Sequence, residues 1–342
     1  MPISNQIAIS DVNNVAIFDK RTWDDILPIQ IIANDPILQS PLVSILNSCK
    51  LDSGGIYATS TFTRRLSSRW DKMASKTDIE VEGIGQIRDG YTAISRYKAW
   101  GQEELVKDIT GNDLLKEIEK ATTQYWSDNF QYCILDMLRG IFDGPLKTTH
   151  QLDASTHTMG WEVVEAAKQK LGDVAQSFKV LIMHSLQLSN LKQAGVVKYR
   201  DAATLGYDVI VKGEIPSING LPIIVTDSVP ITEVAGVKHY HAYIGAPGMI
   251  EFRIINFRNK THWDTLAAGT DYLLQTCRIM TRVPGVSFVL SNAADEMNPS
   301  DTDFINPLCW KKVAQRDKDI PFVEIITKAE TFNLDPEPEP EP

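Results

Sequence analysis

One long stretch of helical periodicity constrains this chain more than any other feature of its sequence. Between residues 112 and 143, apolar side chains recur every three or four positions, the spacing of one helix face. Asn112 or Asp113 can cap the start, and Gly144-Pro145 ends the pattern. A helix of this length extends roughly 45 Å, so we expect a spine that runs across the body. The predicted core stripe of this helix comprises Leu115, Ile118, Trp126, Phe130, Ile134, Met137 and Leu138.

The segment before this helix begins with an arm. Residues 1–50 show no clear hydrophobic period, and the prolines Pro28, Pro36 and Pro41 are expected to break any long helix. Residues 41–46 have the pattern of one or two helical turns. Because this segment cannot bury a core of its own, the sequence predicts an arm laid on another surface.

The next segment predicts a long β-excursion. Residues 55–100 are rich in Thr, Ile, Tyr and Val with period-two runs, and Asp89-Gly90 has the composition of a tight turn. A two-stranded ribbon is marginal in isolation, so we expect it to need a neighbour. Its middle is basic, and the candidate inter-subunit contacts there are Arg64, Arg65, Arg69, Trp70 and Lys72. Such a cluster can touch phosphates or acidic patches on another copy; the net charge of −10 favours the second.

The rest of the chain mixes strands and helices without a repeating strand–helix–strand unit, which predicts an α+β fold. We expect helices over 161–171 and 184–194, and strands over 178–183, 207–211, 221–225 and 321–327. Two hairpins are predicted, one around Gly245-Ala-Pro-Gly248 and one around Val283-Pro-Gly285. Residues 145–157 and 292–306 are predicted to be a polar connector and a polar loop.

Composition excludes several classes of protein. The chain is 43% hydrophobic and 23% charged, which is ordinary globular usage. No apolar run approaches the ~18–20 residues of a membrane helix, and the N-terminus lacks the pattern of a signal peptide. The four cysteines are widely spaced, so we expect buried free thiols. The end, 331–342, is expected to be a flexible acidic tail; without its last eight residues, the chain has 34 bases and 40 acids.

A search for chemistry yields weak candidates only. Gly83-Ile-Gly85 begins like a dinucleotide-binding fingerprint, but the third glycine and the following helix are missing. His239 and His241 lie on one face of a strand, a spacing that can chelate a metal, with His262 the nearest further candidate. No carboxylate stands at ligand spacing, so solvated or stacked hairpin histidines are favoured over a metal site. No catalytic residue, cofactor or metal is predicted.

Two other polar groups have ordinary structural explanations. His184 precedes a predicted helix and is expected to cap it or to sit hydrogen-bonded in the core. The acidic residues at 295, 296, 301 and 303 lack the order of a calcium-binding loop, so a solvated loop is expected.

The order of these segments resembles the major capsid protein of tailed bacteriophages, with its HK97-like (Hong Kong phage) fold. An arm, a β-excursion, a spine helix and a compact α+β region follow one another over about residues 1–330. Local sequences that carry the resemblance are Thr110-Gly-Asn-Asp113, Ala121-Thr-Thr-Gln-Tyr-Trp126, Leu138-Arg-Gly-Ile-Phe142, Met183-His-Ser-Leu-Gln-Leu-Ser-Asn-Leu191, Gly206-Tyr-Asp-Val-Ile210, Gly220-Leu-Pro-Ile-Ile-Val-Thr-Asp227, Asn306-Pro-Leu-Cys-Trp-Lys-Lys-Val313 and Ile320-Pro-Phe-Val-Glu324.

The resemblance implies a division into subdomains. These would be an N-terminal arm (1–50), an E-loop (51–100), a P-domain with the spine helix (101–157), an A-domain (158–270), P-domain return strands with a closing segment (271–330) and the tail.

It also implies the function of a structural subunit that self-assembles into hexamers and pentamers of an icosahedral shell. Such a shell holds double-stranded DNA non-specifically, is assembled in the host bacterial cytoplasm and becomes the virion capsid. The expected partners are a portal and a scaffolding protein. Because the arm begins almost at Met1, the scaffold is expected to be a separate protein.

Two alternatives stay open at this stage. An encapsulin-like nanocompartment shell would use the same fold to enclose cargo enzymes, although the separate arm and long E-loop favour the virus. A metal-dependent hydrolase built on His239 and His241 is the remote enzyme alternative, for which no third ligand or base is visible.

Overall fold

The chain folds into two units, and each unit combines segments that lie far apart in sequence. The computed structural model describes residues 20–64, 66, 83–103, 114–201, 214–264 and 270–330. Only the backbone is described for residues 20–26, 102–103, 114–120, 198–201, 214–215, 261–264 and 270–271. Unit 1 combines Met1–Gln39, Val43–Pro145 and Gly248–Ile320, and unit 2 combines Ser40–Leu42, Leu146–Pro247 and Pro321–Pro342. No described helix is long and apolar enough to cross a membrane.

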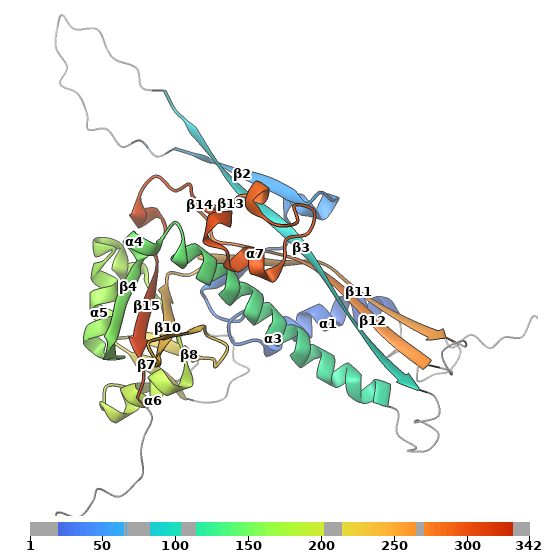
Figure 1. Cartoon of the computed structure of the whole chain (residues 1–342), viewed down its shortest axis with the longest axis horizontal. Coiled ribbons are helices and arrows are strands. Elements are labelled where there is room, and N and C mark those ends of the chain that lie inside the picture. The colour runs from blue at the N-terminus through green and yellow to red at the C-terminus, as the bar shows by residue number, and fades with distance from the viewer. Residues whose placement is uncertain are drawn as a thin grey trace, which may run out of the picture. The chain divides into compact units, whose positions relative to one another are not determined.

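A five-stranded sheet forms the frame of unit 1, in the order β1-β11-β12-β3-β2 (Figure 1). Its strands are β1 (Val43–Ile45), β2 (Tyr57–Thr63), β3 (Gln86–Glu103), β11 (Ile250–Asp264) and β12 (Thr270–Arg282). Only β1 pairs in parallel, with β11; the other neighbours are antiparallel. The long β11–β12 and β12–β3 ladders therefore tie the C-terminal half of the chain to the segment before the spine helix.

The predicted spine helix exists as α3 (Leu114–Asp143), with 30 residues. Its apolar face covers the β11–β12 part of the sheet. The Trp126 ring lies 5.5 Å from Phe257 and the Phe130 ring 5.4 Å from Phe252, measured between centroids. Trp126 Nε1 also donates to Gln275 Oε1 at 2.7 Å, which satisfies the polar atom of an otherwise buried indole. Of the predicted stripe, the described side chains that are buried are Trp126, Phe130, Ile134, Met137 and Leu138.

Close packing near the end of α3 requires glycine. A Cβ at Gly140 would lie 2.0 Å from the Phe304 carbonyl and 2.6 Å from Trp310 Nε1. Phe304 belongs to the short helix α7 (Asp301–Ile305), and Trp310 begins β14 (Trp310–Lys312), which pairs with β13 (Val286–Phe288). A helix-interior glycine costs about 1 kcal/mol relative to alanine. Here it lets the C-terminal part of unit 1 approach the helix.

The arm is more regular than its sequence suggested. The helix α1 (Lys20–Asn34) continues through Pro28, so the expectation that proline breaks it is wrong. Leu27 and Ile31, on either side of Pro28, are completely buried, and α1 packs against α3 and β11. Burial of this face offsets the hydrogen bond that proline removes. Residues 41–46 were expected to be helical, but they contain strand β1, whose partner β11 lies about two hundred residues later.

In unit 2, an eight-stranded sheet has the order β4-β15-β10-β5-β8-β7-β6, with β9 beside β10. The helices α5 and α6 accompany it, and α5 packs against β4 and β15 (Figure 1). The element bounds are α4 (Lys147–His150), β4 (Gln151–Thr158), α5 (Trp161–Gln169), β5 (Val180–Met183), α6 (Ser185–Gln193), β6 (Lys198–Asp201), β7 (Glu214–Ile218), β8 (Leu221–Val225), β9 (Ile231–Val234), β10 (Val237–Gly245) and β15 (Phe322–Lys328).

Both helices and three of the predicted strands in this region are confirmed, since α5, α6, β5, β8 and β15 match the predicted segments closely. The strand predicted over 207–211 lies outside the described residues. The predicted connector 145–157 is wrong: it contains α4 and most of β4, whose parallel partner is β15. A polar strand of this kind lacks the hydrophobic alternation that announces a strand.

Both predicted hairpins are wrong, because strands were paired with the nearest strand in sequence. After Gly245-Ala-Pro-Gly248, the chain leaves the β10 ladder of unit 2 and enters β11 of unit 1. After Val283-Pro-Gly285, β12 gives way to β13, which pairs with β14. Turn residues indicate where the chain changes direction, but they do not determine which strands pair. Strand pairing depends on which distant strand can bury the apolar face.

The aromatic contacts of α3 yield a first test. Phe130 is 2% exposed and packs between Trp126 and Phe252. Because truncation of a buried aromatic side chain costs about 3–5 kcal/mol, Phe130→Ala should lower the melting temperature sharply or cause aggregation. Tyr132→Ala is the matched control, since Tyr132 is 51% exposed on the same helix. Equal melting temperatures for Phe130→Ala and the parent, by calorimetry, would contradict this packing.

Candidate functional site

The β2–β3 ribbon is fastened at one end by hydrogen bonds to the segment that follows β12. Gly90 N donates to Ser287 Oγ at 2.8 Å, and Tyr57 Oη donates to the Phe288 carbonyl at 3.3 Å. Ser287 and Phe288 lie in β13, about two hundred residues after the ribbon. The ribbon base is therefore held by β13 as well as by its ladder with β12.

Asp89-Gly90 lies inside β3, so the prediction of a tight turn there is wrong. Gly90 is required for a different reason. A Cβ at this position would lie 1.6 Å from Tyr57 Oη and 2.8 Å from Ser287 Oγ. Glycine in a strand marks a close approach of other groups as often as a turn, and the sequence pattern does not distinguish the two.

Arg282, at the end of β12, connects the ribbon to the sheet by charge. Its guanidinium stacks over the Tyr91 ring at 4.5 Å and lies 2.6 Å from Glu251 Oε2. It also donates to Ser60 Oγ at 3.0 Å. These contacts join β2, β3, β11 and β12 at one nearly buried cation, so the ribbon base is a rigid part of unit 1.

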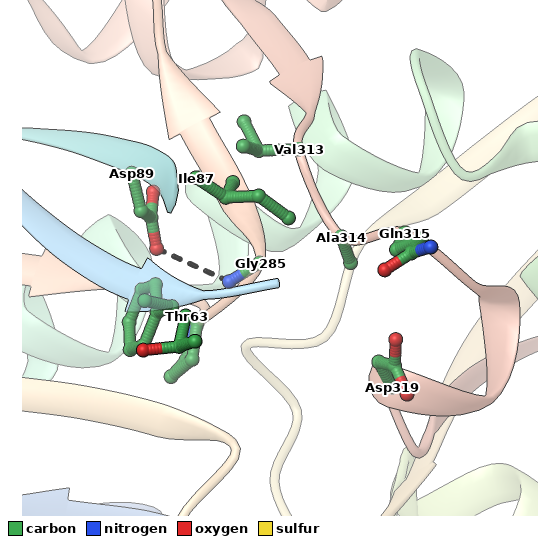
Figure 2. Close-up of a pocket in the computed structure, with 10 residues that line it drawn as sticks. Thr63, Ile87, Asp89, Gly285, Val313, Ala314, Gln315 and Asp319 are labelled. Atoms are coloured by element: carbon green, nitrogen blue, oxygen red, sulfur yellow. Dashed lines mark hydrogen bonds between the residues drawn. The ribbon is translucent and has the colours of Figure 1, made fainter. Parts of the chain in front are cut away.

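A pocket of about 290 Å³ opens beside this base (Figure 2). Thr63, Ile87 and Asp89 from the ribbon face Gly285 and Ala314 across it. Asp89 is completely buried; its Oδ2 accepts a hydrogen bond from Gly285 N at 3.1 Å, and its Oδ1 has no partner within the described residues. Burial raises the pKa of Asp89 to about 6, against the opposing effects of the Gly285 bond and of Arg282.

The candidate contact residues of the ribbon are described only in part. Arg64 follows β2 directly; its backbone N–H donates to the Gly85 carbonyl at 2.8 Å, and its side chain is exposed. Arg65, Arg69, Trp70 and Lys72 lie outside the described residues. In the spine helix, Leu115 and Ile118 lie in the part of α3 whose side chains are not described.

The histidine pair in unit 2 does not form a metal site within the described residues, where no group of three ligating side chains occurs. His241 is buried, and its Nδ1 lies 2.7 Å from Glu324 Oε1. Gln151 Nε2 donates to the other oxygen, Glu324 Oε2, at 2.7 Å. The expectation of solvated or stacked histidines is therefore wrong for His241. The sequence concealed its partner because Glu324 is 83 residues away.

His184 and the acidic residues of segment 292–306 lie at the starts of two helices or beside them. His184 caps α6, as predicted: its Nδ1 accepts a hydrogen bond from Leu186 N at 3.1 Å. The predicted loop 292–306 contains α7, and Asp303 within it is buried, because its carboxylate caps this helix through Ser300 and accepts from Ala294 N. Asp301 pairs with Arg96 at 2.7 Å. The solvated-loop prediction therefore fails for Asp303.

The thiols match their prediction except at one position. Cys133, Cys277 and Cys309 are buried and free, and burial raises the pKa of each thiol. Cys49 is partly exposed, and its Sγ lies 3.3 Å from Asp52 Oδ1.

Comparison with known proteins identifies the family of this chain. Residues 141–323, more than half of the chain, match the Gp13-like family, described as "Major capsid protein 13-like". The chain belongs to this family of major capsid proteins. It is thus a structural subunit of a phage capsid, it is located in the virion capsid, and it is not an enzyme. The resemblance drawn from the sequence is confirmed, and the hydrolase alternative is removed.

Solved structures show the same fold over nearly the whole capsid protein. The capsid of Ralstonia phage GP4 matches with a TM-score of 0.59 at 12% identity, covering 86% of this chain and 89% of that one. A structure from Microbacterium phage Oxtober96 matches with a TM-score of 0.54 at 10% identity, covering 83% and 89%. The capsid of Helicobacter pylori bacteriophage KHP30 matches with a TM-score of 0.53 at 9% identity, covering 85% and 88%. No curated protein sequence matches the chain.

Asp89 gives the capsid protein a pH-dependent stability term with a definite sign. Its pKa rises from 3.8 to about 6 on folding, so the folded state binds the proton more tightly. Stability therefore falls as the pH rises from about 4 to about 6. Asp89→Asn, which keeps an acceptor for Gly285 N, should gain unfolding free energy over the parent. The gain should grow by on the order of 2 kcal/mol between about pH 4 and pH 7.

Denaturant unfolding of both proteins at the two pH values measures this gain. Asp52→Asn is the control with the opposite trend, because the hydrogen bond from Arg253 lowers the pKa of Asp52. A gain for Asp89→Asn that is the same at both pH values would contradict the buried, ionisable state of Asp89.

Proposed function

We propose that this capsid protein builds its shell through contacts made by the β2–β3 ribbon and the segment at its tip. The observation that carries this proposal is that the ribbon is rigid at its base and exposed beyond it. β13 holds Tyr57 and Gly90, and Arg282 holds Ser60. Beyond this base, Phe62 is 41% exposed and Arg64 is also exposed. An exposed edge strand of this kind is a ready surface for another chain.

In this proposal, the parts of the chain have the roles of the subdomains of HK97-like capsid proteins. Residues 1–50 act as the N-terminal arm and 51–100 as the E-loop. The P-domain comprises 101–157 with the return segment 271–330, and the A-domain comprises 158–270. The contact residues of the E-loop are Arg64, Arg65, Arg69, Trp70 and Lys72, which meet acidic side chains of a neighbouring copy. Residues 335–342, at the end of the acidic tail, are dispensable for folding in this proposal.

The assembled form consists of hexamers and pentamers that close into an icosahedral shell around double-stranded DNA. The acidic balance of the chain is compatible with this, because DNA inside a closed shell is confined by the wall and neutralised by counterions. A portal and a scaffolding protein are the further partners in this proposal. The phage capsids among the similar structures favour a viral shell over an encapsulin-like compartment.

Charge reversal in the E-loop tests the proposal. The triple variant Arg64→Glu, Arg65→Glu, Arg69→Glu should leave the purified subunit folded by circular dichroism, because the sheet and α3 do not depend on these charges. It should abolish closed particles, or reduce them at least about tenfold, in negative-stain electron microscopy, since like charges would then face acidic groups of the neighbour.

The triple Arg→Lys variant at the same positions is the matched control, and it should assemble because it retains the charge. Normal shells from the Glu variant would contradict the E-loop assignment. Unfolding of the Glu variant would place these arginines inside the subunit instead.

A further inference from the structure

A groove of about 210 Å³ lies in unit 1 between α3, β3, β12 and α7. Aromatic side chains form much of its lining, and two of them are strongly exposed: Tyr97 at 75% and Tyr132 at 51%. Two carboxylates, Asp136 from α3 and Asp301 from α7, also line it. The groove is smaller than the roughly 300–1,000 Å³ of sites for small-molecule ligands. A single side chain fits this size better than a cofactor does.

The two carboxylates differ in how they are satisfied. Asp301 pairs with Arg96, whose Nη2 lies 2.7 Å away. Asp136 has no hydrogen bond or ion pair with any residue that the structure describes. Its nearest basic neighbour along the helix, Arg139, pairs instead with Asp143 at 3.8 Å. Burial, and next the charge of Asp301, raise the pKa of Asp136 to about 6. The charge of Arg139 opposes this shift, but no described basic side chain forms an ion pair with Asp136.

Aromatic rings beside an unpaired carboxylate are the chemistry that recognises a lysine or an arginine. The same chain shows this combination elsewhere: Arg282 stacks on Tyr91 and pairs with Glu251. Tyr125, which lines the groove, has the Lys98 ammonium 5.9 Å from the centre of its ring. The exposed Tyr97 and Tyr132 have no such cation within the described residues. Arg96 also lines the groove, but its guanidinium is paired with Asp301, so the two exposed rings and Asp136 have no cation of their own among the described residues.

We propose that this groove binds an arginine or lysine side chain of a neighbouring copy of the same chain, with Asp136 as its ion-pair partner. Charge complementarity selects a basic side chain, and a capsid subunit meets copies of itself over much of its surface. The chain offers exposed bases for this purpose, among them Arg64, whose guanidinium has no partner within the described residues. The inference rests on the proposed self-assembly and adds a defined contact to it.

Substitution of Asp136 separates this role from a structural one, because stability and assembly should change in opposite directions. Asp136→Asn removes a poorly solvated charge, so the subunit should melt at the same or a higher temperature than the parent. The subunit concentration needed to form closed particles should nevertheless rise roughly tenfold, as expected when a partner is lost from an ion pair between proteins. Asp128→Asn, on the same helix, is the matched control, since the Asp128 carboxylate accepts from Gln124 on the exposed surface.

A photo-reactive side chain then identifies the occupant. Tyr132→p-benzoylphenylalanine is introduced, and particles are assembled from an equal mixture of nitrogen-14 and nitrogen-15 subunits. The expected product is a cross-linked peptide pair of mixed isotope composition, whose second peptide carries an Arg or Lys at or beside the cross-link.

The proposal is overturned if Asp136→Asn assembles like the parent, or if the cross-links join peptides of one isotope only or do not form. The proposed function is tested separately, because failure of the parent itself to form particles would contradict self-assembly as such.

Discussion

Burial of the aromatic face of α3 is the interaction on which the arrangement of unit 1 depends. Trp126 and Phe130 bury large apolar surfaces, and they do so against Phe252 and Phe257 of β11. These partners lie more than a hundred residues downstream of α3, so the core of unit 1 is closed by contacts between distant parts of the chain. β12 then follows β11 and pairs with β3, so the packing of one helix face fixes where the ribbon begins.

At the base of the ribbon, polar groups attach β2 and β3 to the rest of unit 1. Gly90 leaves room for Tyr57 and Ser287, and Arg282 gathers Glu251, Ser60 and the Tyr91 ring around one cation. Asp89 is buried there with one oxygen unsatisfied, although a buried carboxylate is costly. These interactions fix the base of the ribbon within its own subunit, which the proposed contacts to neighbouring subunits require. In the groove between α3 and α7, Asp136 is the corresponding carboxylate that lacks a partner.

Sequence reasoning found the elements whose signal is local. The period of α3, the amphipathic α5 and the apolar run of β5 were visible because the burying face repeats within the element. His184 was placed at a helix start because capping depends on the next three residues only. The resemblance to phage major capsid proteins could also be recognised, because it depends on the order of the predicted elements along the sequence.

The predictions were wrong where contacts between distant residues determine the structure. Nothing near His241 announces Glu324, and nothing near Gly245 shows that β10 and β11 belong to different sheets. Pro28 remains in a helix because Leu27 and Ile31 are buried by α3 and β11, which a local rule cannot know. The use of Asp89 and Gly90 as packing residues rather than turn residues has the same cause.

Electron cryomicroscopy of particles assembled from the purified chain tests directly whether the β2–β3 ribbon contacts a neighbouring subunit. A map at side-chain resolution shows where residues 64–82 lie with respect to the copies around them. We expect a closed shell in which this segment rests on an adjacent subunit while Gly90 and Tyr57 keep their bonds to β13 of their own subunit. A closed shell in which the segment folds back on its own subunit, without contact to a neighbour, would contradict it.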